Sequence, residues 1–371
     1  MLTVFWLIVV IGALGILQGR FFSWVAFRKL SYRRSISRHT VREGEKIELV
    51  EELINNKLTP LPWLRVESKL SPWLRFKSQE NLEILDDRYH KSVFFLRSYQ
   101  KITRRYEISC IHRGYYDLSV TSLTAGDLLG MATAYKEIRS DAKLFVYPKL
   151  LGEADLPEDA LQWQGDISVK RWIFPDPILI NGIREYRSGD SRKDIHWKAS
   201  ARTGTLQVKT HDYTVCPRVL LVMNIDPEDQ FWGLLSDSQQ ISMEYGVRSV
   251  ATLASWAIEN GMDAGFYSNA KMLHLPNTEI GILPARSDTQ LELIMTTLAG
   301  LQFQQQESIY RTLERIVEDQ ICDADILVFS CFWNAALERR ADAIRALGNT
   351  VAQVEMRKET INFEADAASA V

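Results

Sequence analysis

Residues 218–225, RVLLVMNI, are a nearly continuous apolar run, and the fold of the chain can be worked out from this stretch. Strands buried on both faces of a parallel sheet have this composition, whereas strands with one solvated face alternate apolar and polar residues. The segments that follow alternate between helical and strand patterns. We therefore expect an α/β domain that begins at residue 217.

The downstream segments extend this alternation to residue 356. Apolar residues at helical spacing predict helices at about 240–260, 291–301, 313–317 and 334–347. Apolar runs predict strands at 263–269, 324–332 and 350–356. Asn260–Gly261 and Gly348 stand where helix C-caps are expected. This pattern is typical of a doubly wound α/β domain over 217–356, and residues 357–371 are predicted to be a tail.

The loop after the first α/β strand is a candidate ligand site, because open α/β sheets bind ligands at the carboxyl ends of their strands. Asn224, Asp226 and Glu228 bring three oxygen-bearing side chains to alternate positions of this loop. Oxygen ligands suit Mg²⁺. A weak Mg²⁺ site and a loop without metal both remain open, and the second is favoured, so no cofactor is predicted.

The segment 182–206, GIREYRSGDSRKDIHWKASARTGTL, holds six basic and three acidic side chains. We expect a strand over 182–188, a turn at Gly189 and a short helix over 191–202. Ser191 and Asp194 have the spacing of a helix capping box, and Thr203–Gly204 stops the helix. A strand is predicted at 205–210. Strict alternation of apolar residues over 195–201 leaves a strand open in place of the helix.

Three roles are open for this segment: a docking surface, a structural clasp between domains in which Trp197 fills a crevice, or an enzyme site. Arginine guanidinium groups offer bidentate pairing to carboxylates or phosphates, which favours docking. The candidate docking or clasp residues are Arg184, Tyr186, Gly189, Asp190, Arg192, Trp197, Ser200 and Arg202.

The enzyme alternative is a hydrolase that uses Asp190, His196 and Ser200. No oxyanion-hole loop or nucleophile turn accompanies these residues. The sequence also lacks GxxxxGK[ST], HExxH, CxxC and GxSxG motifs. We therefore predict that the chain is not an enzyme.

Residues 31–148 are predicted to form a β-rich, sandwich-like domain. Short strands with turn signals between them are expected at 47–53, 63–70, 92–98, 102–111, 116–123 and 143–148. Residues 71–91 are interpreted as a charged, irregular insertion. Residues 149–216 are interpreted as a connector that carries the basic segment.

The first 17 residues, MLTVFWLIVVIGALGIL, contain no charged side chain and predict a membrane anchor over 1–30. Basic residues follow this stretch, so the positive-inside rule places the body of the protein in the cytoplasm. The aromatic segment 21–27 suits the membrane interface, or a second short pass.

Overall composition excludes some partners. The 371 residues are 46% hydrophobic and 25% charged, with a net charge of −3, which is ordinary for globular domains and does not favour nucleic-acid binding. The four cysteines have neither tight pairing nor metal-ligand spacing, which fits a reducing compartment.

Residues 184–202 resemble the signature R-x-Y-x-x-G-D-x-R-x-x-I-x-W-x-x-S-A-R of the bacterial family called domain of unknown function 58. Arg113–Tyr116 and Asp127–Gly130 are similar to two further pieces of that family, although Leu128 and Leu129 replace a Pro-Phe pair.

The resemblance implies a membrane-anchored cytoplasmic protein with a von Willebrand factor type A-like domain after residue 217. In such domains the first loop reads Asp-x-Ser-x-Ser, from which Asn224, Asp226 and Glu228 depart. The resemblance also implies an adaptor that works with MoxR-type AAA+ ATPases on envelope or membrane complexes. A Mg²⁺-dependent adhesion-type domain is the other binding function that it leaves open.

Overall fold

The computed structural model describes residues 2–76, 82–85, 89–127, 132–170, 180–187, 190–211, 217–229, 231, 233 and 235–356. The chain divides into two compact units, one built mainly from Met1–Lys149 and the other mainly from Leu150–Ile294. We call them the β unit and the α/β unit. The predicted tail at 357–371 lies outside the described residues.

The β unit begins with one apolar helix, α1 (Leu2–Val25). Its residues Val4–Val25 are long and apolar enough to cross a membrane, at about 33 Å for 22 residues. The aromatic segment that starts at Phe21 continues α1 without a break as far as Val25, so the structure does not support a second pass there.

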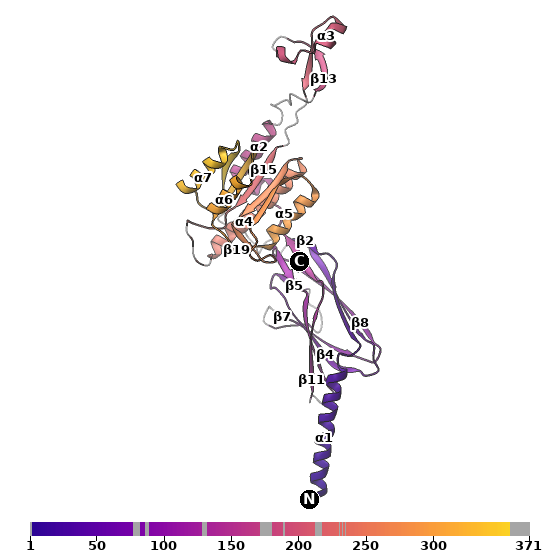
Figure 1. The fold of residues 1–371 in the computed structure, drawn as a ribbon. Helices are drawn as coiled ribbons and strands as arrows, with labels where there is room; N and C mark the ends of the chain where they lie inside the picture. The colour runs from indigo at the N-terminus through magenta and orange to yellow at the C-terminus, as the bar shows by residue number, and fades with distance from the viewer. Residues whose placement is uncertain are drawn as a thin grey trace. The chain divides into compact units, whose positions relative to one another are not determined.

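In the described part of the β unit, three sheets follow α1 (Figure 1). The first has the order β1 (Leu30–Ile36), β3 (Lys46–Asn55), β8 (Lys101–Cys110) and β5 (Leu74–Phe76). The second has the order β11 (Thr133–Arg139), β10 (Val120–Gly126), β4 (Leu61–Lys69), β7 (Tyr89–Leu96) and β6 (Leu82–Leu85). The third has the order β2 (Thr40–Arg42), β12 (Lys143–Tyr147) and β9 (Gly114–Asp117).

The first two sheets share an apolar core. Leu53 of β3 and Leu64, Phe94 and Leu123 of the second sheet belong to one buried cluster. Burial alternates along β3 and β4, so each of these strands has one face on the core. The β-rich prediction for this region is confirmed.

Several β-strand predictions were wrong in detail. The expected strand at 116–123 is two strands, β9 and β10, and the expected insertion at 71–91 contains β5, β6 and the start of β7. The basic run after the anchor, interpreted as a membrane flank, contains β1, in which Arg34 faces inward. A charged residue at an inward-facing position interrupts the apolar face by which a strand is recognised in the sequence. Such a residue can be buried when it has a partner of opposite charge.

That partner is Glu51. Arg34 donates to Glu51 Oε1 through Nη2 at 2.9 Å, and both side chains are fully buried. Nη2 also donates to Ser68 Oγ at 2.8 Å, and Nη1 to the Leu118 carbonyl at 3.1 Å. Tyr32 donates its hydroxyl to the same carboxylate oxygen at 2.8 Å. The ion pair therefore ties β1 and β3 to the second sheet.

The region interpreted as a connector is more regular than expected. It contains the 3₁₀ turn η1 (Glu153–Asp155) and α2 (Glu158–Lys170), whose Trp163 is buried. Residues 171–179 lie outside the described residues. The strands β13 (Ile180–Glu185) and β14 (Gln207–His211) then form a hairpin.

The α/β unit is a mixed five-stranded sheet with the order β18-β16-β15-β20-β21. Its strands are β15 (Arg218–Met223), β16 (Asp263–Ser268), β18 (Ile280–Ala285), β20 (Ala324–Ser330) and β21 (Thr350–Glu355). Only β18 is antiparallel to its neighbour. The neighbours of β15 are β16 on one side and β20 on the other, so the strand order reverses at β15.

Helices pack on both faces of this sheet (Figure 1). The helices are α4 (Asp237–Glu259), α5 (Asp288–Gly300), α6 (Ile309–Glu318) and α7 (Ala335–Arg345). Helices α6 and α7 bury Leu313 and Leu337 against Leu220 and Val222 of β15. On α4, Gly246 lies against Met223, which points to the opposite face.

The predicted helices and the four predicted strands of the α/β unit are confirmed within a few residues. Three short strands were missed: β17 (Ala270–Met272), β18 and β19 (Leu301–Gln305). Pro284 lies inside β18, and a proline in a run argues against a strand.

Candidate functional site

The hairpin module, residues 180–211, carries most of the residues singled out from the sequence. In it β13 pairs antiparallel with β14, and the chain between them forms the 3₁₀ turn η2 (Arg192–Asp194) and the short helix α3 (Trp197–Thr203). Ile195 bridges to Val208 and separates the two turns. The single helix expected over 191–202 was therefore wrong.

Separate caps explain this division. Ser191 accepts a hydrogen bond from the Lys193 backbone N–H, which closes η2 alone. His196 is the N-cap of α3, because its Nδ1 accepts from Ala199 N at 3.1 Å. The helix ends where predicted, at Gly204, whose φ of 73° suits a residue without a Cβ.

Arg184 and Asp190 form a bidentate ion pair within the module. Nη1 and Nη2 of Arg184 donate to the two carboxylate oxygens, each at 2.7 Å. Asp190 also accepts from the backbone N–H of Arg187 at 2.7 Å. The Arg184 hydrogen bonds, followed by that of the Arg187 backbone, lower the pKa of Asp190 to about 2. The pair joins Arg184 of β13 to Asp190 ahead of η2, and Gly189 lies outside the described residues.

The remaining predicted residues divide between packing and exposure. Tyr186 is half-buried, and its backbone N–H donates to the Leu206 carbonyl at 2.8 Å. Arg192 and Arg202 are exposed. Trp197, expected to fill a crevice in a clasp, is instead 69% exposed.

The module has a very small apolar core. Among residues 182–187 and 190–209, whose side-chain burial is described, Ile195 and Val208 are the buried apolar residues, whereas Ile183 and Leu206 are 48% and 47% exposed. Hairpins with so little buried surface are marginal in water. Its large exposed side chains can therefore pack against the surface of another protein.

Asp190, His196 and Ser200 do not form a Ser–His–acid set. Asp190 is paired with Arg184, and His196 Nδ1 caps α3. The Ser200 hydroxyl donates to the His196 carbonyl at 3.1 Å and accepts from Gln207 N at 2.8 Å. Each of the three side chains thus supports the local backbone.

The loop after β15 holds a second candidate site, a buried polar network at the point where the strand order reverses. Asn224 Nδ2 donates to Ser330 Oγ at 3.0 Å, which joins the ends of β15 and β20. Asn224 Oδ1 accepts from the backbone N–H of Asp226 at 3.0 Å. Glu228, the third predicted position, is exposed.

Asn269, which follows β16, occupies the centre of this network. Its Nδ2 donates to Asn224 Oδ1 at 3.1 Å and to Asp226 Oδ2 at 2.8 Å, and its Oδ1 accepts from Ile225 N at 2.9 Å. Gln305 Nε2 lies 3.4 Å from the same Asp226 oxygen. The Asn269 amide thus donates its two N–H groups to Asn224 Oδ1 and Asp226 Oδ2, the oxygens that a bound cation would contact.

These residues do not fit a Mg²⁺ site as they stand. A cation at the centre needs oxygen lone pairs around it, but the Asn269 amide presents hydrogens there. In the part of the chain that the structure describes, no group of three or more His, Cys, Asp or Glu side chains is placed to hold a metal. The network is held together by hydrogen bonds instead.

Asp226 is the ionisable member of the network, and its burial disfavours the charged carboxylate. It is only 7% exposed. Burial raises the pKa of Asp226 to about 6, and the charge of Asp229 raises it further, against the hydrogen bond from Asn269. A buried carboxyl held at a cost to stability often marks a functional site.

We expect Asp226→Asn to stabilise the α/β unit. The raised pKa of Asp226 means that the folded state favours the protonated carboxyl, so stability falls as pH rises from about 4 through 6. The amide removes this loss, and the gain is about 1–3 kcal/mol at pH 8 and near zero at pH 4. Denaturant unfolding of the full chain measures it, with Glu228→Gln as the exposed control. An equal gain at both pH values would contradict the raised pKa.

An exposed rim adjoins the network. Tyr310 donates its hydroxyl to Asp229 Oδ1 at 2.7 Å, and Asn334 Nδ2 donates to Asp229 Oδ2 at 3.0 Å. Asn334 also caps α7. The sequence patterns did not point to these residues or to Asn269. The position of Asn269 and Ser330 at the carboxyl ends of two predicted strands was the available signal.

Comparison with known proteins gives a family and one relative. Residues 182–361 match the sequence model of the family described as "Protein of unknown function DUF58". The chain is also 23% identical over 276 residues to "Uncharacterized protein YeaD" of Bacillus subtilis (strain 168). The match covers 68% of this chain and 64% of that protein, so the chain spans less than two thirds of its relative.

Among solved structures, the likenesses cover about a third of the chain. They include native alpha-2-macroglobulin from Escherichia coli, with a TM-score of 0.26, 13% identity, 32% of this chain covered and 23% of that one. A non-cellulosomal cohesin from Archaeoglobus fulgidus has a TM-score of 0.19 and 7% identity, over 30% of this chain and 92% of that one.

Proposed function

We propose that this chain, whose residues 182–361 form a domain of the DUF58 family, is a membrane-anchored adaptor that binds a protein partner through the hairpin module. The observation that carries the proposal is the exposure of Trp197 and of the basic residues Arg192, Lys198 and Arg202 on an element with little apolar core of its own.

The membrane anchor is α1. Leader peptides that are cleaved do not form part of the folded core, but Ala26, directly after α1, is 1% exposed within the β-unit core, and Phe22 packs against that core. Lys57 Nζ donates to the Val25 carbonyl at 2.6 Å and also to the Ala26 carbonyl. Removal of α1 would open this core. These contacts support a permanent anchor, and the exposed basic residues Arg20, Arg28 and Lys29 at its end support a cytoplasmic body.

The hairpin module is the docking element. The segment 182–206 carries six basic and three acidic side chains in a chain whose net charge is −3. One of those cations, Arg184, is neutralised by Asp190. Tryptophan and arginine are the residues most often found at binding hot spots. We infer a partner with an acidic surface that accepts an aromatic ring.

The partner class follows from the family resemblance. A MoxR-type AAA+ ATPase is the expected partner, and remodelling of membrane or envelope complexes is the expected process. The α/β unit serves as a von Willebrand factor type A-like, doubly wound domain in this proposal. Its reversal of strand order at β15 supports this assignment, and its amide-centred network favours binding that does not need Mg²⁺.

We expect Trp197→Ser and Arg192→Ala each to reduce partner recovery roughly tenfold or more, since truncated hot-spot residues cost about 1.4 kcal/mol or more. Tagged wild-type and variant chains are recovered from solubilised native membranes, and co-purifying proteins are quantified by mass spectrometry. The matched control is Tyr135→Ser, which truncates an aromatic ring that is 64% exposed in the β unit.

The proposal is supported if one protein is retained by wild type and Tyr135→Ser, lost by both module variants, and released by added salt. Thermal melts show whether the variants remain folded. Recovery of the same proteins with all four chains would overturn the docking role.

A further inference from the structure

The end of the β unit at which α1 enters is built from three neighbouring segments. Asn56 N donates to the Lys29 carbonyl at 3.0 Å, just after α1. Tyr99 N donates to the Lys57 carbonyl at 3.2 Å, and Ser98 Oγ donates to the Leu58 carbonyl. The β3–β4 and β7–β8 loops are thus bonded to each other and to the base of the anchor helix.

Each of these loops exposes a large apolar side chain. Leu58 is 75% exposed and Tyr99 is 70% exposed, among the highest fractions for apolar residues of the described chain. Tyr99 has a positive φ of 52°, a conformation that is uncommon for residues other than glycine. The main-chain hydrogen bond to Lys57 holds it there. Two loops therefore project apolar groups beside the helix instead of burying them.

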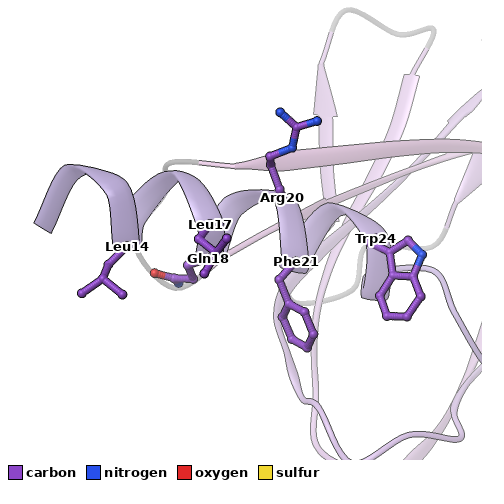
Figure 2. Close-up of a pocket in the computed structure, with 6 residues that line it drawn as sticks. All are labelled: Leu14, Leu17, Gln18, Arg20, Phe21 and Trp24. Carbon is purple, nitrogen blue, oxygen red and sulfur yellow. The ribbon is translucent and has the colours of Figure 1, made fainter. Parts of the chain in front are cut away.

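The aromatic end of α1 continues this surface. Figure 2 shows Arg20, Phe21 and Trp24 near the end of α1, where they line one pocket. Phe21 and Trp24 are 56% and 64% exposed, and the Arg28 guanidinium lies 4.4 Å from the Trp24 ring centre. Tryptophan and tyrosine are favoured at the headgroup level of bilayers.

The exposed charge of this end is mainly positive. Residues 19–30, 55–62 and 95–101 contain no aspartate or glutamate. Their exposed basic residues are Arg20, Arg28, Lys29, Arg97 and Lys101, of which Lys101 pairs with Glu52 of β3, whereas Lys57 is buried. A cationic surface near a membrane is attracted to anionic lipids by about 1 kcal/mol for each basic residue.

We propose that the α1 end of the β unit rests on an anionic lipid surface, with Leu58 and Tyr99 inserted into the interface beside Trp24. This inference rests on the proposed anchor role of α1 and extends it, because a helix alone would leave the β unit free to tilt. Here Lys57, the neighbour of Leu58, holds the end of the helix, so the anchor and both loops meet the bilayer together.

The dimensions agree with this placement. Arg20 ends the uncharged stretch of α1, and Val25 lies about 8 Å farther along the helix. The headgroup layer on one side of a bilayer is about 5–8 Å thick. If Arg20 reaches the edge of the hydrocarbon, the loops bonded near Val25 lie within reach of the headgroups.

An environment-sensitive fluorophore on single cysteines tests the proposal in the full chain. Cys216, Cys322 and Cys331 are first replaced by serine, and Cys110 stays because it is fully buried. Leu58→Cys and Tyr99→Cys are labelled, and the protein is reconstituted in vesicles of phosphatidylcholine alone or with one-third phosphatidylglycerol. Emission wavelength and quenching by iodide are measured.

Two control positions separate the possible failures. Trp73→Cys reports the opposite end of the β unit. The Trp73 carbonyl accepts a hydrogen bond from Ile111 N, just after β8. The paired part of β3, from Ile54 to Lys46, separates that end from the loops by about 27 Å. Ile11→Cys reports the interior of α1. If the proposal holds, positions 58 and 99 are blue-shifted and quenched roughly threefold less than position 73 in the anionic vesicles.

Equal quenching at 58, 99 and 73, with position 11 shielded, would overturn the lipid-contact surface and leave the anchor intact. Quenching at position 11 as well would overturn the anchor itself. Shielding that does not depend on phosphatidylglycerol would retain the insertion of Leu58 and Tyr99 but overturn the role of the cations.

Discussion

Replacing Arg34 with methionine is expected to destabilise the β unit by about 3–5 kcal/mol, because it leaves the Glu51 carboxylate buried without its cation. Both side chains are fully buried, and Glu51 Oε2 has no hydrogen-bond partner in the structure. All of the compensation passes through Oε1, which receives Arg34 and Tyr32. In a unit of this size the loss lowers the melting temperature by roughly 10 °C.

The double variant Arg34→Met/Glu51→Leu is expected to recover most of that stability, since an apolar pair of similar volume often replaces a buried ion pair without loss. Arg33→Met is the matched control, because Arg33 faces solvent on the same strand. Thermal unfolding of the detergent-solubilised full chain measures all three. A single variant as stable as the Arg33→Met control would show that Glu51 gains solvent or another partner.

The same ion pair shows why part of the β unit was not predictable from local pattern. In residues 30–36, LSYRRSI, period-two alternation puts Arg34 on the same face as the three apolar residues, but a charge on that face argues against burial unless its partner is known. The partner of Arg34 lies on another strand, and its hydrogen bonds reach Ser68 and Leu118. Long-range pairing decided the outcome. In contrast, 218–223 is apolar at nearly every position, and its strand was predictable without knowledge of its neighbours.

In the candidate sites, too, some features follow from local sequence and others depend on long-range pairing. The Gly204 cap and the two strands of the hairpin follow from local chemistry and were predicted. The division of 191–202 into η2 and α3 was not, because the bridge from Ile195 to Val208 depends on residues that come later in the chain. Likewise, Asn224 and Asp226 were identified from the strand that precedes them. Asn269 was not, because its role arises from the pairing of β15 with β16.

The second large effect is expected on stability when the amide of Asn269 is replaced by a carboxyl. Asn269→Asp keeps the shape of the side chain but removes the N–H donors to Asn224 and Asp226. It also places a carboxylate beside Asp226, whose pKa is already raised to about 6 by burial. Two carboxyls at this distance share one proton. We expect a small loss of stability at pH 5 and a loss of about 2–4 kcal/mol at pH 8.

The sign follows from linkage. A carboxyl whose pKa is raised in the folded state contributes its stability at low pH, and the contribution is lost as pH rises through the folded value. Denaturant unfolding at the two pH values measures the loss. Asn277→Asp is the matched control, because it makes the same chemical change in an exposed loop. A loss that is equal at pH 5 and pH 8 would mean that the two carboxyls do not interact.

Added Mg²⁺ distinguishes a network closed by an amide from a masked metal site. If the amide occupies the position of a cation, millimolar Mg²⁺ should leave the wild-type unfolding free energy unchanged and restore part of the loss in Asn269→Asp, whose carboxylates supply oxygen ligands. Equal stabilisation of both proteins would show that the native residues already accept the ion. The amide would then be a movable lid on a metal site, and the partner-binding role of this loop would depend on Mg²⁺ after all.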